Sequence, residues 1–203
     1  MATKKTTETK NHTVLGGTDW LKYKICISGA SVTTHCSPDT LQKAEAIGRE
    51  IAKRNMVLVT GATTGVPYWA AKGAKQAGGV VIGISPAASN VHHVKTYHLP
   101  VDYHDLIIYT GFGYAGRDLL LVRSADAVVS ICGRIGTLNE FTSAFEDRKP
   151  LGILTKTGGA ADMIKEIIQR TSAPASPLAA DDDPEKLIEK VLELIKAEEK
   201  GLE

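Results

Sequence analysis

The segment with the clearest chemical potential is residues 132–140, Cys-Gly-Arg-Ile-Gly-Thr-Leu-Asn-Glu. It follows an apolar run, residues 127–131, that predicts a buried strand, and it leads into a predicted helix over residues 138–146. A glycine-bearing turn between a strand and a helix leaves backbone N–H groups unpaired, and the helix dipole adds positive potential there. The turn therefore predicts an anion site, with phosphate as the simplest occupant. The residues expected to contact that phosphate are Gly133, Arg134, Gly136 and Thr137.

Glu140 lies in the first turn of this predicted helix, and two roles are open to it. It is close enough to act on whatever the phosphate carries. Thr137-Leu-Asn-Glu140 also fits a capping box, in which the threonine and glutamate side chains satisfy two backbone N–H groups and no chemistry is needed. The sequence does not decide between the two roles, although a cap needs neither Gly133 nor Gly136, whereas the close approach of a phosphate does.

Further glycine-bearing loops are expected beside the first. Residues 60–65, Thr-Gly-Ala-Thr-Thr-Gly, follow a predicted strand and offer N–H groups and hydroxyls, although a tight turn alone would also use the glycines. Gly29, Gly61, Gly111 and Gly133 each stand just after a predicted strand, so their loops should converge at one edge of the sheet, where ligands bind in such folds. The ligand-binding residues predicted in the first two loops are Gly29, Ala30, Ser31, Gly61, Thr63, Thr64 and Gly65.

Residues 111–116, Gly-Phe-Gly-Tyr-Ala-Gly, match the GxGxxG pattern of dinucleotide-binding proteins and lie between a predicted strand and a predicted helix. That fingerprint usually occupies the first strand-to-helix turn, however, and several strands precede this one. The next predicted strand is followed by residues 132–134, which contain no acidic side chain that could bind the hydroxyls of a ribose. A contact between Arg134 and a 2′-phosphate leaves an NADP-binding protein as a minor alternative.

Arg117 follows this loop and also has two interpretations. It can form a structural ion pair, with Asp118 or Asp126 as the partner. A guanidinium also suits planar, multidentate contact with ribose and phosphate oxygens.

These residues require a scaffold of alternating strands and helices. Continuous apolar strands separated by helices predict an α/β fold, with a parallel sheet covered by helices on both faces. Ser37 is expected to cap the first helix, with Pro38 at its first position. The predicted strands cover residues 23–27, 56–60, 80–84, 105–110, 127–131 and 151–154. The predicted helices cover residues 38–54, 68–76, 114–123, 138–146, 160–170 and 184–200.

The 203 residues suit one domain over residues 14–203, after a disordered tail over residues 1–13. Residues 172–183 read as a loop or hinge. The amphipathic final helix, residues 184–200, is expected to pack on the chain's own sheet, with a dimer contact as the alternative.

Bulk composition excludes several classes of protein. The net charge of +1 gives no reason to expect a nucleic-acid partner, and no apolar run approaches the roughly 18–20 residues of a membrane span. The polar start is no secretory signal, and the three cysteines form an odd set, so a reducing cytoplasm is the expected location. Cys26 and Cys132 lie in or beside apolar strands and are expected to be small buried hydrophobes.

A metal site is not expected from the histidines. No cysteine accompanies them at zinc spacing, and they read as surface or loop residues. They are His92, His93, His98 and His104.

Ordered motifs over residues 23–170 resemble the LOG-like proteins, once mislabelled lysine decarboxylases. Residues 124–140, Ser-Ala-Asp-Ala-Val-Val-Ser-Ile-Cys-Gly-Arg-Ile-Gly-Thr-Leu-Asn-Glu, look like the ADA…PGGxGTxxE core of that family. Arg117 stands eight residues before Ala125, as the family arginine does. Residues 60–66 and 70–83 look like its GGxxGLM…A..GA..AGG.VIG region.

The resemblance implies a Rossmann-like three-layer sandwich, a homo-oligomer (dimer or tetramer) and a small phosphorylated ligand. LOG members cleave the N-glycosidic bond of nucleoside 5′-monophosphates, and this resemblance would assign phosphate binding to Gly133, Gly136 and Thr137. It would place Arg117 and Glu140 beside the ribose as catalytic groups, with Glu140 stabilising positive charge at the anomeric carbon and activating water. The activity would require no cofactor.

Three departures from the family pattern point to a neighbouring branch that includes molybdenum-cofactor carrier proteins. Cys132-Gly133-Arg134 replaces Pro-Gly-Gly, Asn139 replaces the first glutamate of LEE, and residues 114–116 replace Met-His-Glu. Arg134 adds bulk where backbone should approach phosphate, so it either swings outward or obstructs the site. The sequence therefore predicts a LOG-like protein that binds a nucleotide or other phosphate ligand, with phosphoribohydrolase activity as one outcome. The alternative is a non-catalytic carrier of a phosphorylated cofactor such as the molybdenum cofactor.

Overall fold

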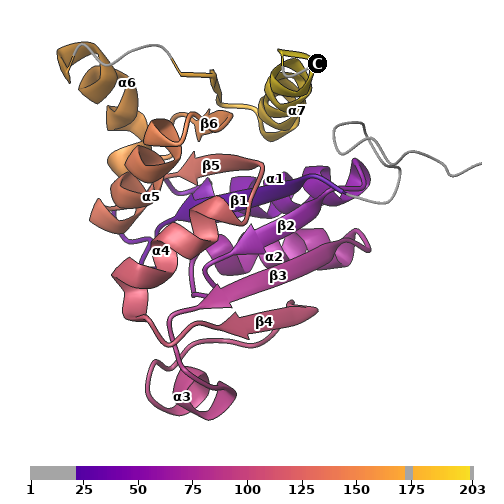
Figure 1. Cartoon of the computed structure of the whole chain (residues 1–203), viewed down its shortest axis with the longest axis vertical. Coiled ribbons are helices and arrows are strands. Elements are labelled where there is room, and N and C mark those ends of the chain that lie inside the picture. Colours follow the sequence, from indigo (N-terminus) through magenta and orange to yellow (C-terminus); the bar gives the residue numbers. More distant parts are fainter. Residues whose placement is uncertain (1–21, 172–175, 202–203) are drawn as a thin grey trace, which may run out of the picture.

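A computed structural model describes residues 22–171 and 176–201, so the expected tail, residues 1–13, and part of the expected hinge lie outside the described residues. The described chain forms one seven-stranded sheet, and every pairing in it is parallel. Along the sheet the order is β4-β3-β2-β1-β5-β6-β7 (Figure 1). The strands are β1 (Lys24–Gly29), β2 (Val57–Thr60), β3 (Val80–Ser85), β4 (Leu106–Tyr109), β5 (Ala127–Ile131), β6 (Leu151–Leu154) and β7 (Leu178–Asp181).

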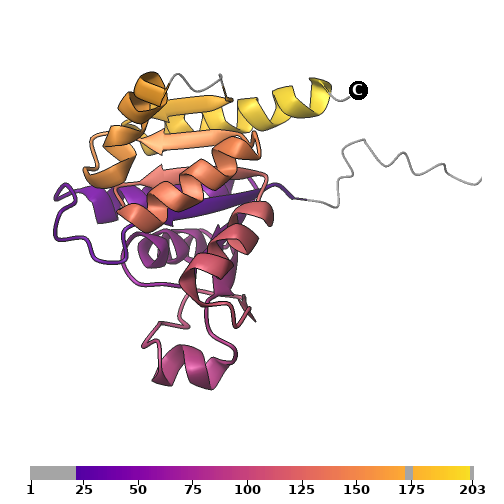
Figure 2. The ribbon, with the colours of Figure 1, turned by 60° about the vertical axis from the view of Figure 1, so that its left-hand side comes forward.

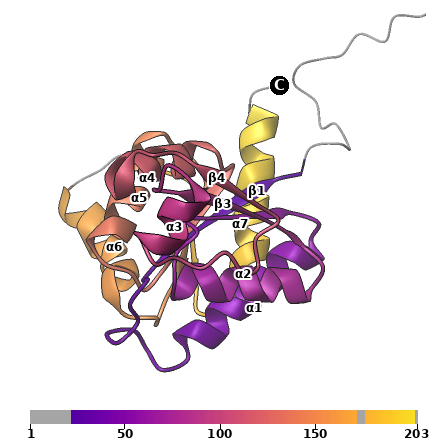
Figure 3. The ribbon, with the colours of Figure 1, turned by 90° about the horizontal axis from the view of Figure 1, so that it is seen from below.

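Helices cover both faces of the sheet, which confirms the predicted α/β, Rossmann-like sandwich. One face carries α1, α2 and α7, while α4, α5 and α6 lie on the other (Figure 3). The short α3 lies beyond the β4 edge (Figure 2). The helices are α1 (Thr40–Lys53), α2 (Val66–Gln76), α3 (Asn90–Lys95), α4 (Gly113–Arg123), α5 (Ile135–Glu146), α6 (Gly159–Thr171) and α7 (Pro184–Gly201).

Alternating side chains of the central strands divide the core into two layers. Ile25 and Ile27 of β1 pack with α1, α2 and α7, whereas Cys26, between them, packs with α4, α5 and α6. This follows from the two-residue period of a strand, which sends successive side chains to opposite faces. Ser28 therefore points to the same side of the sheet as α4 and α5, which becomes important at the site.

The order of the strands reverses between β1 and β5, because the chain builds outward from β1 to β4 and then returns to pair β5 with β1. In open α/β sheets, the loops that leave the carboxyl ends of two such strands run to opposite faces and leave a crevice between them. The loops after β1 and β5 are the ones that border this crevice.

Two elements were absent from the sequence prediction. β7 lies within residues 172–183, which we expected to be a loop or hinge, and α3 was not predicted at all. Leu178-Ala-Ala-Asp181 has little strand propensity of its own, but pairing with β6 supplies its backbone partners. The six residues of α3 are too few to show a helical period, and the Ser89 side chain accepts a hydrogen bond from the N–H of His92 as its N-cap.

Helix starts were also placed imprecisely. The first helix begins at Thr40 with Asp39 as its N-cap, so the predicted Ser37 cap with Pro38 at N1 is wrong. The N–H of Ser37 donates instead to the carbonyl of Thr157, which ties this loop to the turn before α6. α2 begins at Val66, two residues before the predicted start.

α7 packs against β6, β7 and α1 of its own chain, as expected for the final helix. Its apolar stripe, Leu187, Ile188, Val191 and Ile195, is buried there. Across the described ranges, every helix is too short or too polar to traverse a lipid bilayer.

Candidate functional site

A pocket of about 190 Å³ opens at the crevice between the loops after β1 and β5. Its walls come from the loops after β1 and β2 and from the first turns of α2, α4 and α5, so distant segments of sequence meet there. The lining residues are Ile27, Gly29, Ser31, Gly61, Thr63, Pro67, Tyr114, Arg117, Asp118, Gly136, Thr137 and Glu140.

The first turn of α5 provides the unpaired amides that the sequence predicts, although the helix begins at Ile135 and not at Leu138. Within the described chain, the N–H groups of Ile135, Gly136 and Thr137 have no hydrogen-bond acceptor, and the first N–H to be paired is that of Leu138. Gly136 is exposed and has open space around the position of a Cβ. The geometry is that of a helix N-terminus open to an anion.

The capping-box interpretation of Glu140 is wrong. Thr137 lies inside the helix, and the N-cap residue is Arg134, whose side chain makes no capping hydrogen bond. The Glu140 carboxylate instead accepts a hydrogen bond from the hydroxyl of Ser28 on β1. Glu140 is therefore held under the pocket by the neighbouring strand, one helical turn below Gly136.

The Glu140 side chain is 7% exposed, and its pKa is raised to about 7. Burial is the main cause because it penalises the charged form. The neighbouring Asp118 carboxylate raises the pKa further, while the Arg117 charge and the Ser28 hydrogen bond oppose the shift. A carboxyl group with this pKa can hold or release a proton near neutral pH, which is the property of a general acid or base.

Arg117 reaches the same pocket from α4, and only 4% of it is exposed. Its Nη1 donates to the carbonyl of Ile84, 3.0 Å away, while its Nε lies 3.2 Å from the Asp118 carboxylate without hydrogen-bond geometry. A Cβ at Gly61 would overlap the Arg117 guanidinium, so any other residue there would displace this side chain from its place. The Arg117–Asp118 ion pair considered for this arginine is present, and it does not use the full hydrogen-bonding capacity of Arg117.

Asp118 explains one of the departures from the LOG-like pattern. Asn139 donates from its amide to the Asp118 carboxylate over 3.1 Å. A glutamate at position 139 would place a second negative charge against Asp118, whereas asparagine provides a donor. Asp118 and Asn139 are therefore matched across α4 and α5.

Five of the predicted ligand-binding residues do not line the pocket. Ala30 and Thr64 hold neighbouring loops together, since the Ala30 carbonyl accepts from the N–H of Val66 and the Thr64 hydroxyl donates to the carbonyl of Ser31. Gly65 is the N-cap of α2. Gly133 is buried behind the pocket with a φ of 88°, and a Cβ there would collide with Thr137. The fifth residue is Arg134.

Arg134 swings outward, which is one of the two outcomes expected for it. Its guanidinium lies 3.3 Å from Nδ1 of His35, on the solvent-facing side of the loop after β1. It neither lines nor obstructs the pocket.

Five residues that complete the site were not predicted as site residues, namely Ile27, Ser28, Pro67, Tyr114 and Asp118. Ser28 and Asp118 had a detectable signal, because each is a polar residue next to a position already singled out. Tyr114 lies within the 111–116 motif, which was considered only as a dinucleotide fingerprint, while Ile27 and Pro67 gave no signal because their roles depend on how the loops meet.

A family model described as the SLOG cluster4 family matches residues 22–188, most of the chain. The chain belongs to the SLOG cluster4 family. An uncharacterised relative from Archaeoglobus fulgidus is 34% identical over 119 residues, which is 59% of this chain and 73% of the relative.

Solved structures similar to this SLOG cluster4 protein include two proteins described by the cofactor that they bind or carry. The molybdenum cofactor binding protein from Rippkaea orientalis superposes with a TM-score of 0.68 at 29% identity, over 88% of this chain and 98% of that protein. The molybdenum cofactor carrier protein from Chlamydomonas reinhardtii superposes with a TM-score of 0.70 at 26% identity, over 87% and 99%. The resemblance to the SLOG superfamily near these carriers is thus confirmed.

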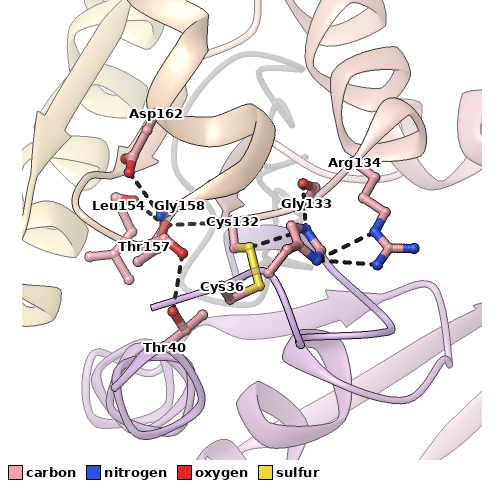
Figure 4. The surroundings of a disulfide bond; sticks show 10 residues. Cys36, Thr40, Cys132, Gly133, Arg134, Leu154, Thr157, Gly158 and Asp162 are labelled. Atoms are coloured by element: carbon pink, nitrogen blue, oxygen red, sulfur yellow. Dashed lines mark hydrogen bonds between the residues drawn. A yellow bond between two sulfur atoms is a disulfide. The ribbon is translucent and has the colours of Figure 1, made fainter. Parts of the chain in front are cut away.

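A disulfide joins Cys36 and Cys132 next to the pocket (Figure 4). The expectation that Cys132 is a free buried hydrophobe is therefore wrong for this SLOG cluster4 protein, although Cys26 is free and fully buried. The two partners are 96 residues apart in sequence, and only the pairing of β1 with β5 brings their loops together.

His35 lies close to this disulfide. His35, Cys36 and Cys132 are the one group within the described ranges whose donor atoms could surround a metal ion, and here the two sulfurs are bonded to each other.

The prediction that all four histidines within residues 92–104 lie at the surface or in loops is wrong for one of them. His93 is fully buried, with Nδ1 2.8 Å from the Ser85 hydroxyl and Nε2 3.0 Å from the carbonyl of Pro100. It connects α3 to the end of β3 and is not the surface or loop residue that we expected.

Proposed function

We propose that this protein binds a phosphorylated cofactor of the molybdenum-cofactor type and carries it without chemical change. The observation that carries this proposal is the similarity over nearly the full length of proteins that bind or carry the molybdenum cofactor, at 26–29% identity. The pocket supports it independently, because the α5 amides and the buried, unpartnered Nε of Arg117 converge there. Unsatisfied buried donors are costly, and an anion would satisfy them.

The size of the pocket suits one end of such a ligand. Its volume of about 190 Å³ is below the roughly 300–1,000 Å³ of sites that enclose a whole drug-sized molecule. We expect it to enclose the phosphate and the adjoining ring, while the remainder extends toward solvent. A ligand held mainly by one end can be handed on to another protein, which is what a carrier must do.

The charges around the pocket set the conditions for anion binding. Arg117 and the α5 dipole attract a phosphate, whereas Asp118 and ionised Glu140 repel it. Because the pKa of Glu140 is about 7, this side chain is largely neutral in mildly acidic solution and largely charged in alkaline solution. Affinity for an anion is therefore expected to fall as the pH rises through about 7.

The test is a binding measurement with molybdenum cofactor under anaerobic conditions. The expected result is a one-to-one complex from which unchanged cofactor is recovered after release. Inorganic phosphate should compete with it, and the Gly136→Asp variant should bind it about 100-fold more weakly. Failure of the wild-type chain to bind the cofactor, with phosphate bound normally, would point to a different phosphorylated ligand.

Hydrolysis of nucleoside 5′-monophosphates is the second candidate function, and the paired Arg117 and Glu140 in one pocket favour it. Glu140 would stabilise the developing positive charge at the anomeric carbon and activate water, and Arg117 would hold the ribose and phosphate oxygens. Release of free base and ribose 5-phosphate from AMP or another monophosphate would establish this activity. Glu140→Gln should then remove turnover and leave ligand binding intact.

Self-association as a dimer or tetramer stays a prediction. It is supported by apolar side chains that α4 and the residue before it leave exposed, with Phe112 at 68% and both Leu119 and Leu120 at 42%. Light scattering of the full chain measures the assembly size directly.

A further inference from the structure

We propose that the Cys36–Cys132 disulfide is a redox-active site, opened by a dithiol reductant, and that its oxidation state sets the anion affinity of the neighbouring pocket. The first part stands on the surroundings of the disulfide alone. The second part rests on the proposed function, because it assumes that the pocket binds a phosphorylated ligand.

The two sulfurs differ in accessibility, which decides where a thiol can attack. Cys36 is half-buried in the loop after β1, and its neighbours Thr34 and His35 are exposed. Cys132 is fully buried at the end of β5. An incoming thiolate therefore reaches Sγ of Cys36, and Sγ of Cys132 becomes the leaving group.

The surroundings of Cys132 favour its departure as a thiolate. Nε2 of His35 lies 3.6 Å from its sulfur and 3.1 Å from the carbonyl of Gly133 (Figure 4). Since a carbonyl only accepts, Nε2 carries the proton, and Nδ1 accepts from Arg134 at 3.3 Å. A thiolate at Cys132 would thus have the His35 N–H as a hydrogen-bond donor. The Arg134 guanidinium lies on the other side of His35, and the N-terminus of α5 is nearby.

The reaction balances with a dithiol as the reductant. Its thiolate attacks Sγ of Cys36, which breaks the S–S bond, forms a mixed disulfide at Cys36 and releases the Cys132 thiolate. The second thiol of the reductant then attacks the reductant's own sulfur in the mixed disulfide and releases the Cys36 thiolate. Two electrons and one proton pass to the protein, which is left with a Cys36 thiol and a Cys132 thiolate, while the second proton goes to the solvent and the reductant leaves as its own disulfide.

Reduction leaves the main fold in place, because backbone hydrogen bonds anchor both cysteines. The N–H of Cys132 donates to the Thr157 hydroxyl at 2.9 Å (Figure 4), and the N–H of Ser37, the residue after Cys36, donates to the Thr157 carbonyl at 3.0 Å. Residues 32–35 are tied to the β5 loop through the disulfide and His35, and the next residue, Cys36, also forms an isolated bridge with Gly158. Opening the disulfide removes one of these ties, so residues 32–35 should move more freely in the reduced protein.

The link to the pocket is electrostatic. Cys132 stands three residues before Ile135, whose N–H opens the anion site, so a thiolate at Cys132 would repel a bound phosphate. Loss of the tether would also release Arg134 from its fixed place beside His35. The oxidised form is therefore expected to bind phosphate more tightly than the reduced form.

Thiol mapping tests the first part on the full chain. After native treatment with dithiothreitol, N-ethylmaleimide should label Cys36 within minutes and the buried Cys132 more slowly, with no label on either before treatment. Cys26 is the internal control, because it is fully buried and burial raises the pKa of its thiol, so it should react only after unfolding. A pair that is reduced only in denaturant would overturn the redox-active assignment.

Single-cysteine variants test the direction of attack. With oxidised glutathione, Cys36 in the Cys132→Ser variant should form a mixed disulfide about ten-fold faster than Cys132 in the Cys36→Ser variant, since only Cys36 is accessible. Equal rates, or a faster reaction at Cys132, would contradict the assigned order.

Titration with inorganic phosphate at pH 8 tests the coupling. The oxidised wild-type chain should bind about five-fold more tightly than the reduced one. Equal affinities, or tighter binding after reduction, would refute the coupling even if the disulfide is redox-active. If neither form binds phosphate or molybdenum cofactor, the proposed function fails, while the thiol measurements still decide whether the disulfide is redox-active.

Discussion

Two glycine-bearing loops of this protein look alike in sequence and differ in what their amides do. Residues 111–116, after β4, match GxGxxG in full, yet the N–H groups of Gly111 and Gly113 donate to Ala87 and Pro86, and that of Phe112 donates to the Thr110 hydroxyl. Residues 132–137, after β5, match no complete fingerprint, but the N–H groups of Gly133 and Arg134 in the turn itself have no acceptor in the described chain, and neither do those that open α5. In the 111–116 segment only the N–H groups of the first helical turn, residues 114–116, are left without an acceptor. The difference follows from position in the sheet.

β4 is an edge strand, and the loop that follows it is covered by the loop after β3, whose carbonyls accept from it. In contrast, β5 borders the crevice at which the strand order reverses. Amides at the crevice have no protein segment above them and remain available to a ligand. A glycine pattern therefore identifies a turn, and the topology decides whether that turn binds anything. The 111–116 loop lacks the position of a dinucleotide fingerprint, which removes the main support for an NADP-binding protein.

The largest expected effect comes from the covalent tether that only the second loop has. Cys36→Ser should lower the free energy of unfolding by about 4 kcal/mol, because the disulfide closes a segment of 96 residues in the unfolded chain. Urea unfolding followed by circular dichroism measures the change. Wild-type protein unfolded with dithiothreitol is the control and should match the variant. A difference below about 1 kcal/mol would mean that the tether contributes little to stability.

The next effect concerns the carboxylate below the second loop. The pKa of Glu140 is about 7 in the folded chain against an ordinary 4.5, so between these values the folded protein keeps a proton that the unfolded chain has lost. Stability should therefore fall as pH rises from about 4.5 to 7, by up to about 3 kcal/mol, and then level off. Glu140→Gln should remove this contribution when unfolding is compared at pH 5, 6, 7 and 8. A variant with the same pH dependence as wild type would refute the shifted pKa.

The sharpest comparison of the two loops places a negative charge in each. Gly136→Asp sets a carboxylate against the unpaired amides of α5 and should weaken phosphate binding by about 100-fold, equal to about 3 kcal/mol. Phe112→Asp places the same charge in the 111–116 loop, at a residue that is 68% exposed and does not line the pocket, and should change phosphate binding less than about three-fold because solvent screens it. Isothermal titration calorimetry with inorganic phosphate compares them. Equal losses of phosphate affinity in the two variants would show that the two loops do not differ in anion binding.

The smallest effect is expected when the first loop is loosened. Thr110 donates to the carbonyl of Ser85 and accepts from the N–H of Phe112, so Thr110→Val should cost about 1 kcal/mol of stability. Phosphate affinity should stay unchanged, since these bonds hold the loop and not a ligand. A loss of affinity in this variant would show that the turn over residues 111–113, which does not line the pocket, still contributes to binding.

While the meeting of Arg117 and Glu140 was expected from the resemblance to the LOG-like proteins, residue patterns alone were sufficient for the α/β class and six of the seven strands. These features are local, because apolar runs, helical periods and glycines after strands are visible within short windows. β7 and α3 were missed for the same reason: one depends on its neighbour in the sheet, and the other is too short to show a period.

Tertiary structure decided what the sequence left open. It placed Ser28 beside Glu140 and so excluded the capping box, turned Arg134 outward to His35, and matched Asn139 to Asp118. It also joined Cys36 to Cys132, which are 96 residues apart. Each of these contacts crosses between elements whose adjacency follows from the pairing of β1 with β5, and no local pattern encodes that pairing.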